Sequence, residues 1–210
     1  MKYGESLFDI VYLVIAVTIG IRILSRSKNR LSTLMGYSIL ILGCGDAFHL
    51  IPRVLNYFID DNFNFYLGLG KLITSITMTI FYILIYYIYL IKYKEKENKN
   101  ITYTIWILSI IRIILCLFPQ NRWFINQSPF IWGIIRNVPF TILGIIIAIL
   151  YFNRRKEDNT FKNIWLYIIL SFIFYTIVVI GAQSLPILGI FMLPKTICYI
   201  LIIFSFKNQK

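Results

Sequence analysis

Residues 72–91 read LITSITMTIFYILIYYIYLI, a run of 20 residues without a charged side chain, and the charged stretch KYKEKENK follows at 92–99. An α-helix rises about 1.5 Å per residue, so 20 residues extend about 30 Å, the thickness of the hydrocarbon core of a bilayer. The stretch therefore predicts a membrane-spanning helix that ends in a charged loop.

Apolar runs of this kind recur along the whole chain and predict an all-α membrane protein of seven transmembrane helices. Their expected ranges are about 6–25, 32–55, 65–91, 101–118, 129–152, 162–183 and 185–206. The composition agrees, because 59% of the 210 residues are hydrophobic and 14% are charged, whereas soluble domains carry about 25% charged residues. No polar stretch is long enough for a separate soluble domain, so we expect residues 1–210 to form a single seven-helix transmembrane domain.

The basic residues alternate between the connections that join these spans. The first, third and fifth connections each hold four bases, and the tail holds two more: Arg22, Arg26, Lys28 and Arg30; Lys92, Lys94, Lys96 and Lys99; Arg154, Arg155, Lys156 and Lys162; Lys207 and Lys210. The second connection has Arg53 beside Asp60 and Asp61, the fourth has Arg122 alone, and the sixth has none. Cytoplasmic loops are enriched in lysine and arginine, so this pattern predicts an N-terminus outside and a C-terminus in the cytoplasm.

An internal symmetry accompanies this topology. Helices one to three and five to seven are expected to run in the same directions, with helix four between them. Similar residues recur at comparable positions of the two halves, namely Lys71 and Lys195, Gly45 and Gly181, and Pro52 and Pro186. We therefore expect a weak 3+1+3 parallel pseudo-repeat, a feature of some transporter folds.

Charge and cysteine usage exclude several classes of function. The net charge of +12 resides largely in short clusters between spans, as membrane insertion requires, so nucleic-acid binding is not expected. The three cysteines all lie inside predicted spans, which argues against a disulfide framework. With one histidine in the chain, no zinc or haem ligand set can be assembled, and neither a metal nor another cofactor is expected.

Four bases fall inside predicted spans, on four different helices: Lys71, Arg112, Arg136 and Lys195. Each costs about 2.5–3.5 kcal/mol near a helix centre on the insertion scale, so such residues usually face a bundle interior or a wet cavity. All four lie in the outer or middle part of the membrane, where Asp46 is the one deep carboxylate. The excess of positive charge predicts an electropositive cavity that opens to the outer face and binds an anion.

The segment GDAFHLIPR at 45–53 is the densest polar part of a span. Its Asp46, His49 and Arg53 have the i, i+3, i+7 spacing that predicts a common helix face. With Lys71, they are expected to line the cavity. The complete set of candidate ligand-binding residues is Asp46, His49, Arg53, Lys71, Ser75, Arg112, Arg136, Asn137, Lys195 and Tyr199.

Three functions fit these residues. The preferred hypothesis is a protein that binds, and transports or senses, an anionic small molecule or amphiphile, such as a phosphate, carboxylate, sulfate or lipid headgroup. The first alternative is a membrane-embedded enzyme that acts on a phospholipid-like substrate, with Asp46 or His49 as general acid or base. The second is a structural or accessory subunit whose bases pair with a partner or reach the headgroups.

The expected location is a membrane, with lipids as neighbours. The abundance of isoleucine, lysine, asparagine and tyrosine is typical of an AT-rich genome and indicates a bacterial cytoplasmic membrane. The sequence indicates no oligomeric state.

Overall fold

A computed structural model describes residues 2–59 and 62–209, and every regular element in them is helical. The α-helices are α1 Lys2–Ser25, α2 Arg30–Phe58, α3 Asn64–Lys92, α4 Lys99–Leu117, α5 Phe130–Asn153, α6 Ile164–Gly181 and α7 Met192–Lys207. Three short 3₁₀ segments are η1 Pro119–Asn121, η2 Trp123–Ile125 and η3 Pro186–Phe191, the last of which continues into α7. Seven helices in the described residues are long and apolar enough to cross a membrane, which confirms this part of the prediction.

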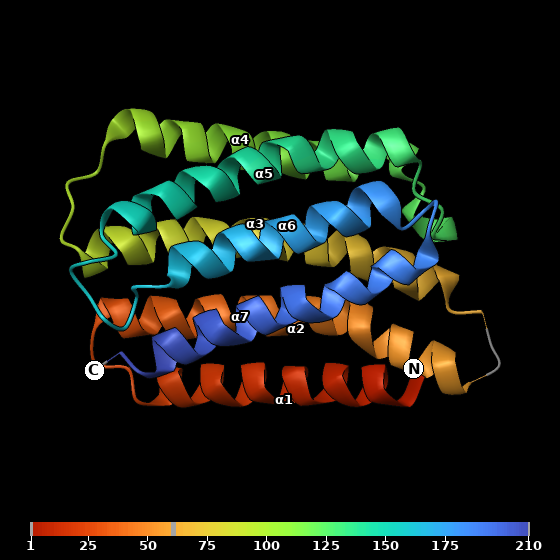
Figure 1. Ribbon diagram of the computed structural model, residues 1–210, viewed down its shortest axis with the longest axis horizontal. Helices are drawn as coiled ribbons and strands as arrows, with labels where there is room; N and C mark the ends of the chain where they lie inside the picture. The colour runs from red at the N-terminus through yellow and green to blue at the C-terminus, as the bar shows by residue number, and fades with distance from the viewer. Residues whose placement is uncertain (1, 60–61, 210) are drawn as a thin grey trace.

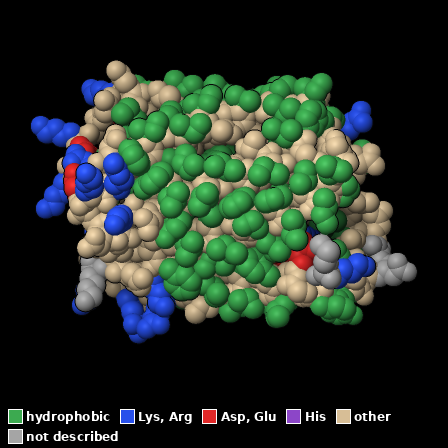
Figure 2. Space-filling model, viewed as in Figure 1, with side chains coloured by type: hydrophobic (Ala, Val, Ile, Leu, Met, Phe, Trp, Pro, Cys, Tyr) green, Lys and Arg blue, Asp and Glu red, His purple; other side chains and the backbone are tan. Residues whose placement is uncertain are grey.

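Successive helices run in alternating directions, so the odd-numbered connections and the C-terminus lie at one end of the bundle (Figure 1). The even-numbered connections lie at the other end, beside the start of α1. In the space-filling view, a hydrophobic face separates two polar ends, and lysine and arginine side chains gather at the end that holds the C-terminus (Figure 2). The expected sides of Met1 and Lys210, and the role of Asp60 and Asp61, concern residues outside the described ranges.

Local capping explains where several helices begin and end. The Asn29 side chain accepts a hydrogen bond from the Ser32 backbone N–H (2.8 Å) and so caps the N-terminus of α2. Asn98 does the same for α4, because it accepts from the Asn100 N–H at 3.0 Å. At the other end of α4, Phe118 is extended before Pro119, and residues that precede a proline avoid the helical conformation.

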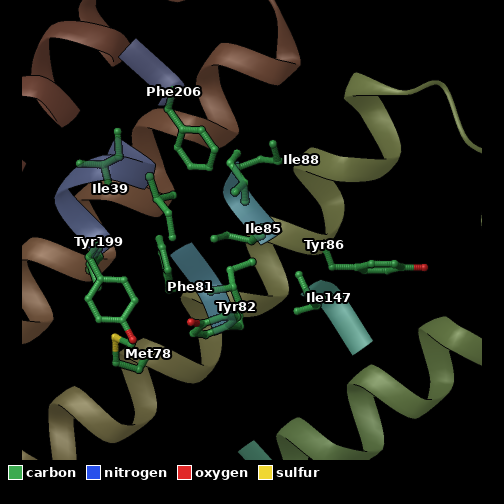
Figure 3. Close-up of a cluster of buried hydrophobic side chains, with 14 of the residues drawn as sticks. Ile39, Met78, Phe81, Tyr82, Ile85, Tyr86, Ile88, Ile147, Tyr199 and Phe206 are labelled. Atoms are coloured by element: carbon green, nitrogen blue, oxygen red, sulfur yellow. The ribbon is translucent and has the colours of Figure 1, made fainter. Parts of the chain in front are cut away.

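The core is built around α3, whose buried side chains pack against α2, α5 and α7 (Figure 3). Tyr82 and Ile85 on α3 are fully buried, as is Ile147 on α5. The Tyr82 ring meets the Phe140 ring edge-on, with centroids 5.2 Å apart, a favoured arrangement for aromatic pairs. This aromatic layer lies next to the polar site described below, because Phe140 belongs to both.

Two glycines allow other segments to approach α3 closely. A Cβ atom at Gly70 would overlap the backbone oxygen of Phe48 and lie 2.7 Å from the Cα of His49. A Cβ at Gly68 would overlap the backbone oxygen of Trp123. Small residues permit such backbone contact between membrane helices. The glycines therefore bring His49 and the α4–α5 connection against the helix that carries Lys71.

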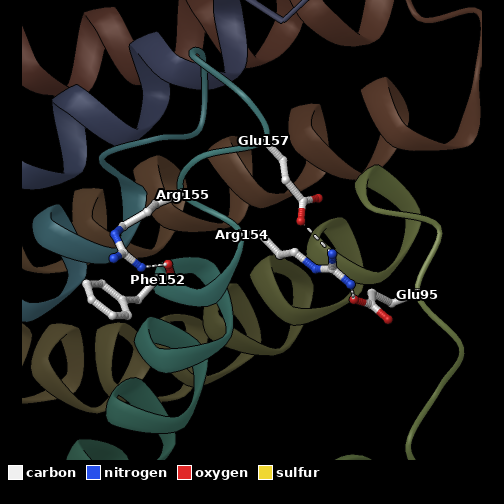
Figure 4. Close-up of polar contacts among 5 residues, drawn as sticks. All are labelled: Glu95, Phe152, Arg154, Arg155 and Glu157. Atoms are coloured by element: carbon white, nitrogen blue, oxygen red, sulfur yellow. Dashed lines mark hydrogen bonds and ion pairs between the residues drawn. The ribbon is translucent and has the colours of Figure 1, made fainter.

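Ion pairs tie the connections together at the end that holds the C-terminus (Figure 4). Arg154 pairs with Glu95 and, at 2.5 Å, with Glu157, which joins the α3–α4 connection to the α5–α6 connection. Lys92 at the end of α3 pairs with Asp158 at 2.7 Å. Half-buried pairs of this kind fix loop positions but contribute modestly to stability.

The pair between Lys92 and Asp158 predicts a pH-dependent contribution to stability. Burial tends to raise the pKa of the Asp158 carboxyl, but hydrogen bonds from Lys92 and the Thr160 N–H, with the charge of Lys92, hold it below its ordinary value. The stabilisation is then complete above the unfolded pKa of about 3.9 and is lost as the pH falls through the lower folded value. We expect Asp158→Asn to lower the free energy of unfolding by about 0.5–1 kcal/mol at pH 7.

Thermal denaturation of both proteins from pH 7 to pH 3 checks this expectation. The difference between wild type and Asp158→Asn should shrink as the pH falls below 4. A difference that stays constant over this range would contradict an ionic contribution of Asp158.

Candidate functional site

A cavity of about 420 Å³ lies within the half of the bundle that holds the even-numbered connections. Its walls come from α3, α4, α5, α6 and α7, with His49 from α2 and residues of the α4–α5 connection. Six of the candidate residues named from the sequence line it: His49, Lys71, Ser75, Arg112, Arg136 and Lys195. The four bases of separate helices thus converge on one space, and the described lining contains no aspartate or glutamate.

Arg112 is the most deeply buried of these bases, with 2% of its surface exposed. Its Nε and Nη1 atoms are buried and have no hydrogen-bond partner among the described residues. The guanidinium lies over the Phe140 ring, with Cζ 3.1 Å from the ring centre. This cation–π contact is worth about 0.5–2 kcal/mol, but it leaves both N–H groups without an acceptor.

Lys195 is also buried and is surrounded by aromatic rings. Its ammonium lies 4.7 Å from the centre of the Tyr175 ring and 5.5 Å from that of Tyr199. It lies within electrostatic range of Asp46. No ion pair within 4.0 Å joins Lys195 to a carboxylate in residues 2–59 and 62–209.

Lys71 and Arg136 are held by neutral side chains of the α4–α5 connection. The Lys71 ammonium donates to Asn126 Oδ1 at 2.6 Å. The Arg136 guanidinium donates to Asn121 Oδ1 at 2.7 Å and to Ser128 Oγ at 2.5 Å. These acceptors orient the two bases without cancelling their charge, so the cavity remains electropositive.

The α4–α5 connection, residues 118–129, was not among the predicted site elements. Asn121 is fully buried and donates to the backbone oxygens of Leu115, Cys116 and Phe118, which lack partners at the end of α4. Trp123 Nε1 donates to the Cys116 oxygen at 2.8 Å. Because the connection folds inward, its polar side chains reach the cavity. The signal in the sequence was the density of asparagine and proline, which favours turns.

Not every candidate on α2 faces the cavity. Arg53 pairs with Glu5 on α1 and lies 3.9 Å from Asp9, and Asp46 accepts a hydrogen bond from Tyr12 at 2.7 Å. Neither Asp46 nor Arg53 belongs to the lining. Positions i and i+7 differ by only about 20° around a helix, whereas position i+3 is displaced by about 60°. Asp46 and Arg53 therefore turn together toward α1, and His49 turns toward α3.

Asn137 and Tyr199 lie behind the lining. Asn137 Oδ1 accepts a hydrogen bond from the Tyr175 hydroxyl at 3.0 Å, and Tyr175 does line the cavity. Tyr199 is buried and packs edge-on against Phe81 at a centroid distance of 6.0 Å. Both residues support the walls, through Tyr175 in one case and through the aromatic core in the other.

The site offers donors for an anion rather than ligands for a cation. In the described part of the chain, no group of three or more His, Cys, Asp or Glu side chains could hold a metal ion. Arginine and lysine side chains are hydrogen-bond donors without acceptor atoms, and their hydrogen bonds to oxyanions are about twice as strong as hydrogen bonds between neutral groups.

Fold and site together define an all-helical protein whose seven apolar helices are consistent with a membrane helical bundle. Comparison with models of protein families, with curated proteins and with solved structures finds no match to the chain.

Proposed function

We propose that this protein is an integral membrane protein that binds an anionic small molecule or amphiphile in the basic cavity. Such binding is the step that transport and sensing of an anion share. The proposal is carried by one observation: the Arg112 guanidinium is 2% exposed and has two buried nitrogen atoms without an acceptor in the described residues. A buried donor left without a partner costs about 1–3 kcal/mol, and more when it is charged.

The surroundings of Arg112 strengthen this proposal. Lys71, Arg136 and Lys195 line the same space, and the described lining contains no carboxylate. Four like charges in a low-dielectric space repel one another, and an anion at their centre removes most of that cost. An anion would also supply the acceptors that Arg112 lacks.

The enzyme alternative has less support. Of its two candidate residues, His49 lines the cavity, but Asp46 accepts a hydrogen bond from Tyr12 and lies outside the described lining. The structural alternative needs the intramembrane bases to pair with a partner or to reach the headgroups, and Arg112, with 2% of its surface exposed, fits neither. We therefore favour binding of an anion over both.

A thermal-shift screen tests the proposed function. Purified full-length protein is heated with inorganic phosphate, sulfate, carboxylates or lysophospholipids, each across a range of concentrations. A ligand that binds only the folded state raises its stability by RT ln(1 + [L]/Kd), about 2.7 kcal/mol at 100 times Kd. We expect at least one anion to raise the melting temperature, and no response to any of them would refute the proposal.

We also propose that the N-terminus is outside and the C-terminus in the cytoplasm, in a bacterial cytoplasmic membrane. The support is the alternation of basic residues between the connections. In this orientation the basic cavity faces the outer half of the membrane.

Cysteine labelling in intact cells checks the orientation. In a background without Cys44, Cys116 and Cys198, a membrane-impermeant maleimide should label Ser184→Cys in the sixth connection. It should label Lys96→Cys in the third connection only after permeabilisation. Ser184 and Lys96 are both exposed, so a difference in labelling would not reflect burial of one of the two positions. Labelling of Lys96→Cys in intact cells would overturn the topology.

A further inference from the structure

A second hollow adjoins the basic cavity and lies on the lateral surface of the bundle, between α5 and α6. It encloses about 260 Å³ and includes Ile134, Val138, Ile142 and Ile180 in its lining. These four side chains are 37–55% exposed, so this α5–α6 groove opens sideways, toward the lipid of a membrane. From Ile134 to Ile142 it follows α5 for about 12 Å, at 1.5 Å per residue.

The groove and the cavity meet at Tyr175 and Val179, which line both hollows. The Tyr175 ring faces the Lys195 ammonium, and its hydroxyl donates to Asn137, a residue of the groove. The basic cavity, with its charged hydrogen-bond donors, therefore lies directly behind the α5–α6 groove. The chemistry of the two hollows is that of the two parts of an amphiphile.

We propose that the ligand is a single-chain amphiphile with a phosphate headgroup, whose head enters the basic cavity and whose chain lies in the α5–α6 groove. This inference rests on the proposed anion-binding function and names the class of ligand. Such a molecule approaches from within the bilayer, because its hydrocarbon chain already lies among the lipid tails. Only its headgroup has to pass between α5 and α6 to reach the cavity.

The charges of the cavity favour phosphate over a carboxylate. Four bases line the space. In the part of the chain that the structure describes, Arg112 Nε and Nη1 have no hydrogen-bond partner, and no ion pair within 4.0 Å joins Lys195 to a carboxylate. A phosphate monoester carries about −1.5 to −2 charges at pH 7 and three acceptor oxygens. Its oxygens can accept hydrogen bonds from the unpartnered nitrogens of Arg112, and a further oxygen remains for Lys195.

The groove favours a hydrocarbon chain over a free anion. Five of its nine lining residues are aliphatic, and the other four are Asn137, Thr141, Thr176 and Tyr175, whose hydroxyl is bonded to Asn137. Relative to free ligand in water, each methylene buried in the groove or in the surrounding lipid contributes about 0.8 kcal/mol, or close to a fourfold gain in affinity. Inorganic phosphate can use the cavity alone, whereas an alkyl phosphate uses both hollows.

The test compares inorganic phosphate with octyl phosphate, octanoate and the uncharged octyl maltoside. Dissociation constants are measured by calorimetry on the full-length protein in phosphatidylcholine nanodiscs, and the heat measured with empty nanodiscs is subtracted. Octyl phosphate should bind most tightly, and three methylenes in the groove would give a gain of about 60-fold over inorganic phosphate. Octanoate should bind more weakly than octyl phosphate, and octyl maltoside should not bind.

Two tryptophan substitutions on α5 test where the hydrocarbon chain of the ligand lies. Val138 lines the groove but not the cavity, and Ile149 lines neither hollow, although 51% and 53% of their surfaces are exposed. Val138→Trp fills the groove and should reduce the affinity for octyl phosphate, because the head and the hydrocarbon chain can no longer occupy both hollows together. Ile149→Trp is the matched control and should keep the full gain.

The outcomes separate this inference from the proposed function. Equal affinities of the wild type for inorganic and octyl phosphate would overturn the amphiphile and leave anion binding intact. A gain that survives Val138→Trp would place the chain elsewhere, and octanoate binding as tightly as octyl phosphate would overturn the phosphate assignment. If octyl maltoside binds while every anion fails, the proposed anion-binding function itself is lost.

Discussion

Replacement of Arg112 by glutamine is expected to remove most of the anion-dependent thermal stabilisation while leaving the unliganded protein about as stable as the wild type. The charge and both unpaired nitrogens disappear from the buried site, which relieves a desolvation cost. The cation–π contact with Phe140 is lost at the same time, at about 0.5–2 kcal/mol. In the free protein these two effects oppose each other, so its stability changes little. In the complex, the hydrogen bonds from the guanidinium to the anion are lost as well.

The expected size follows from the strength of such bonds. A hydrogen bond to a charged group is worth about 1.5–3 kcal/mol, so loss of one such bond weakens binding by about 10- to 160-fold, and loss of a second weakens it further. At an anion concentration that saturates the wild type, Arg112→Gln should therefore show little shift. Arg112→Lys should restore only part of it, because an ammonium cannot make a bidentate contact.

Arg122→Gln provides the matched control, since Arg122 is an exposed arginine of the α4–α5 connection outside the cavity lining. It should respond to anions like the wild type. Equal shifts in wild type and Arg112→Gln would remove Arg112 from the site. If Arg112→Gln and Arg122→Gln lose the anion-dependent rise in melting temperature to the same extent, the loss would reflect the net charge of the protein.

Replacement of Gly70 by alanine is expected to destabilise the fold strongly and to weaken anion binding with it. The added Cβ would overlap the Phe48 oxygen and lie 2.7 Å from His49 Cα, so α2 and α3 must separate. Overpacking of a well-packed core costs about 1–3 kcal/mol, and backbone atoms cannot move aside as a flexible side chain can. Lys71 and His49 flank this contact and line the cavity, so they would shift together.

Gly133→Ala separates this effect from the general cost of replacing a helical glycine. Gly133 lies on α5, and a Cβ there meets no atom within 4 Å. Alanine is also the better helix former by about 1 kcal/mol, so this variant should match or exceed the wild type in thermal stability. Equal melting temperatures for Gly70→Ala and Gly133→Ala would contradict the close approach of α2 and α3.

Several features of this protein followed from its sequence alone, because they depend on properties local to one segment. Apolar runs such as 72–91 predict the seven spans, and their limits agree with the helices to within about four residues, except that the seventh span includes η3 and so begins seven residues before α7. The bases Lys71, Arg112, Arg136 and Lys195 were singled out because charge inside an apolar run is costly whatever the fold. The orientation remains a prediction from the same local pattern.

Only the tertiary structure decided which of these residues meet. Helical spacing put Asp46, His49 and Arg53 on roughly one face, but a helix in a bundle has neighbours on several sides. His49, which faces the cavity, is rotated about the helix axis by about 60° from Asp46 and about 40° from Arg53, which both face α1. The inward fold of residues 118–129 depends on unpaired backbone oxygens at the end of α4 and on close contact at Gly68. The α5–α6 groove likewise exists only where two helices meet, so no single segment encodes it.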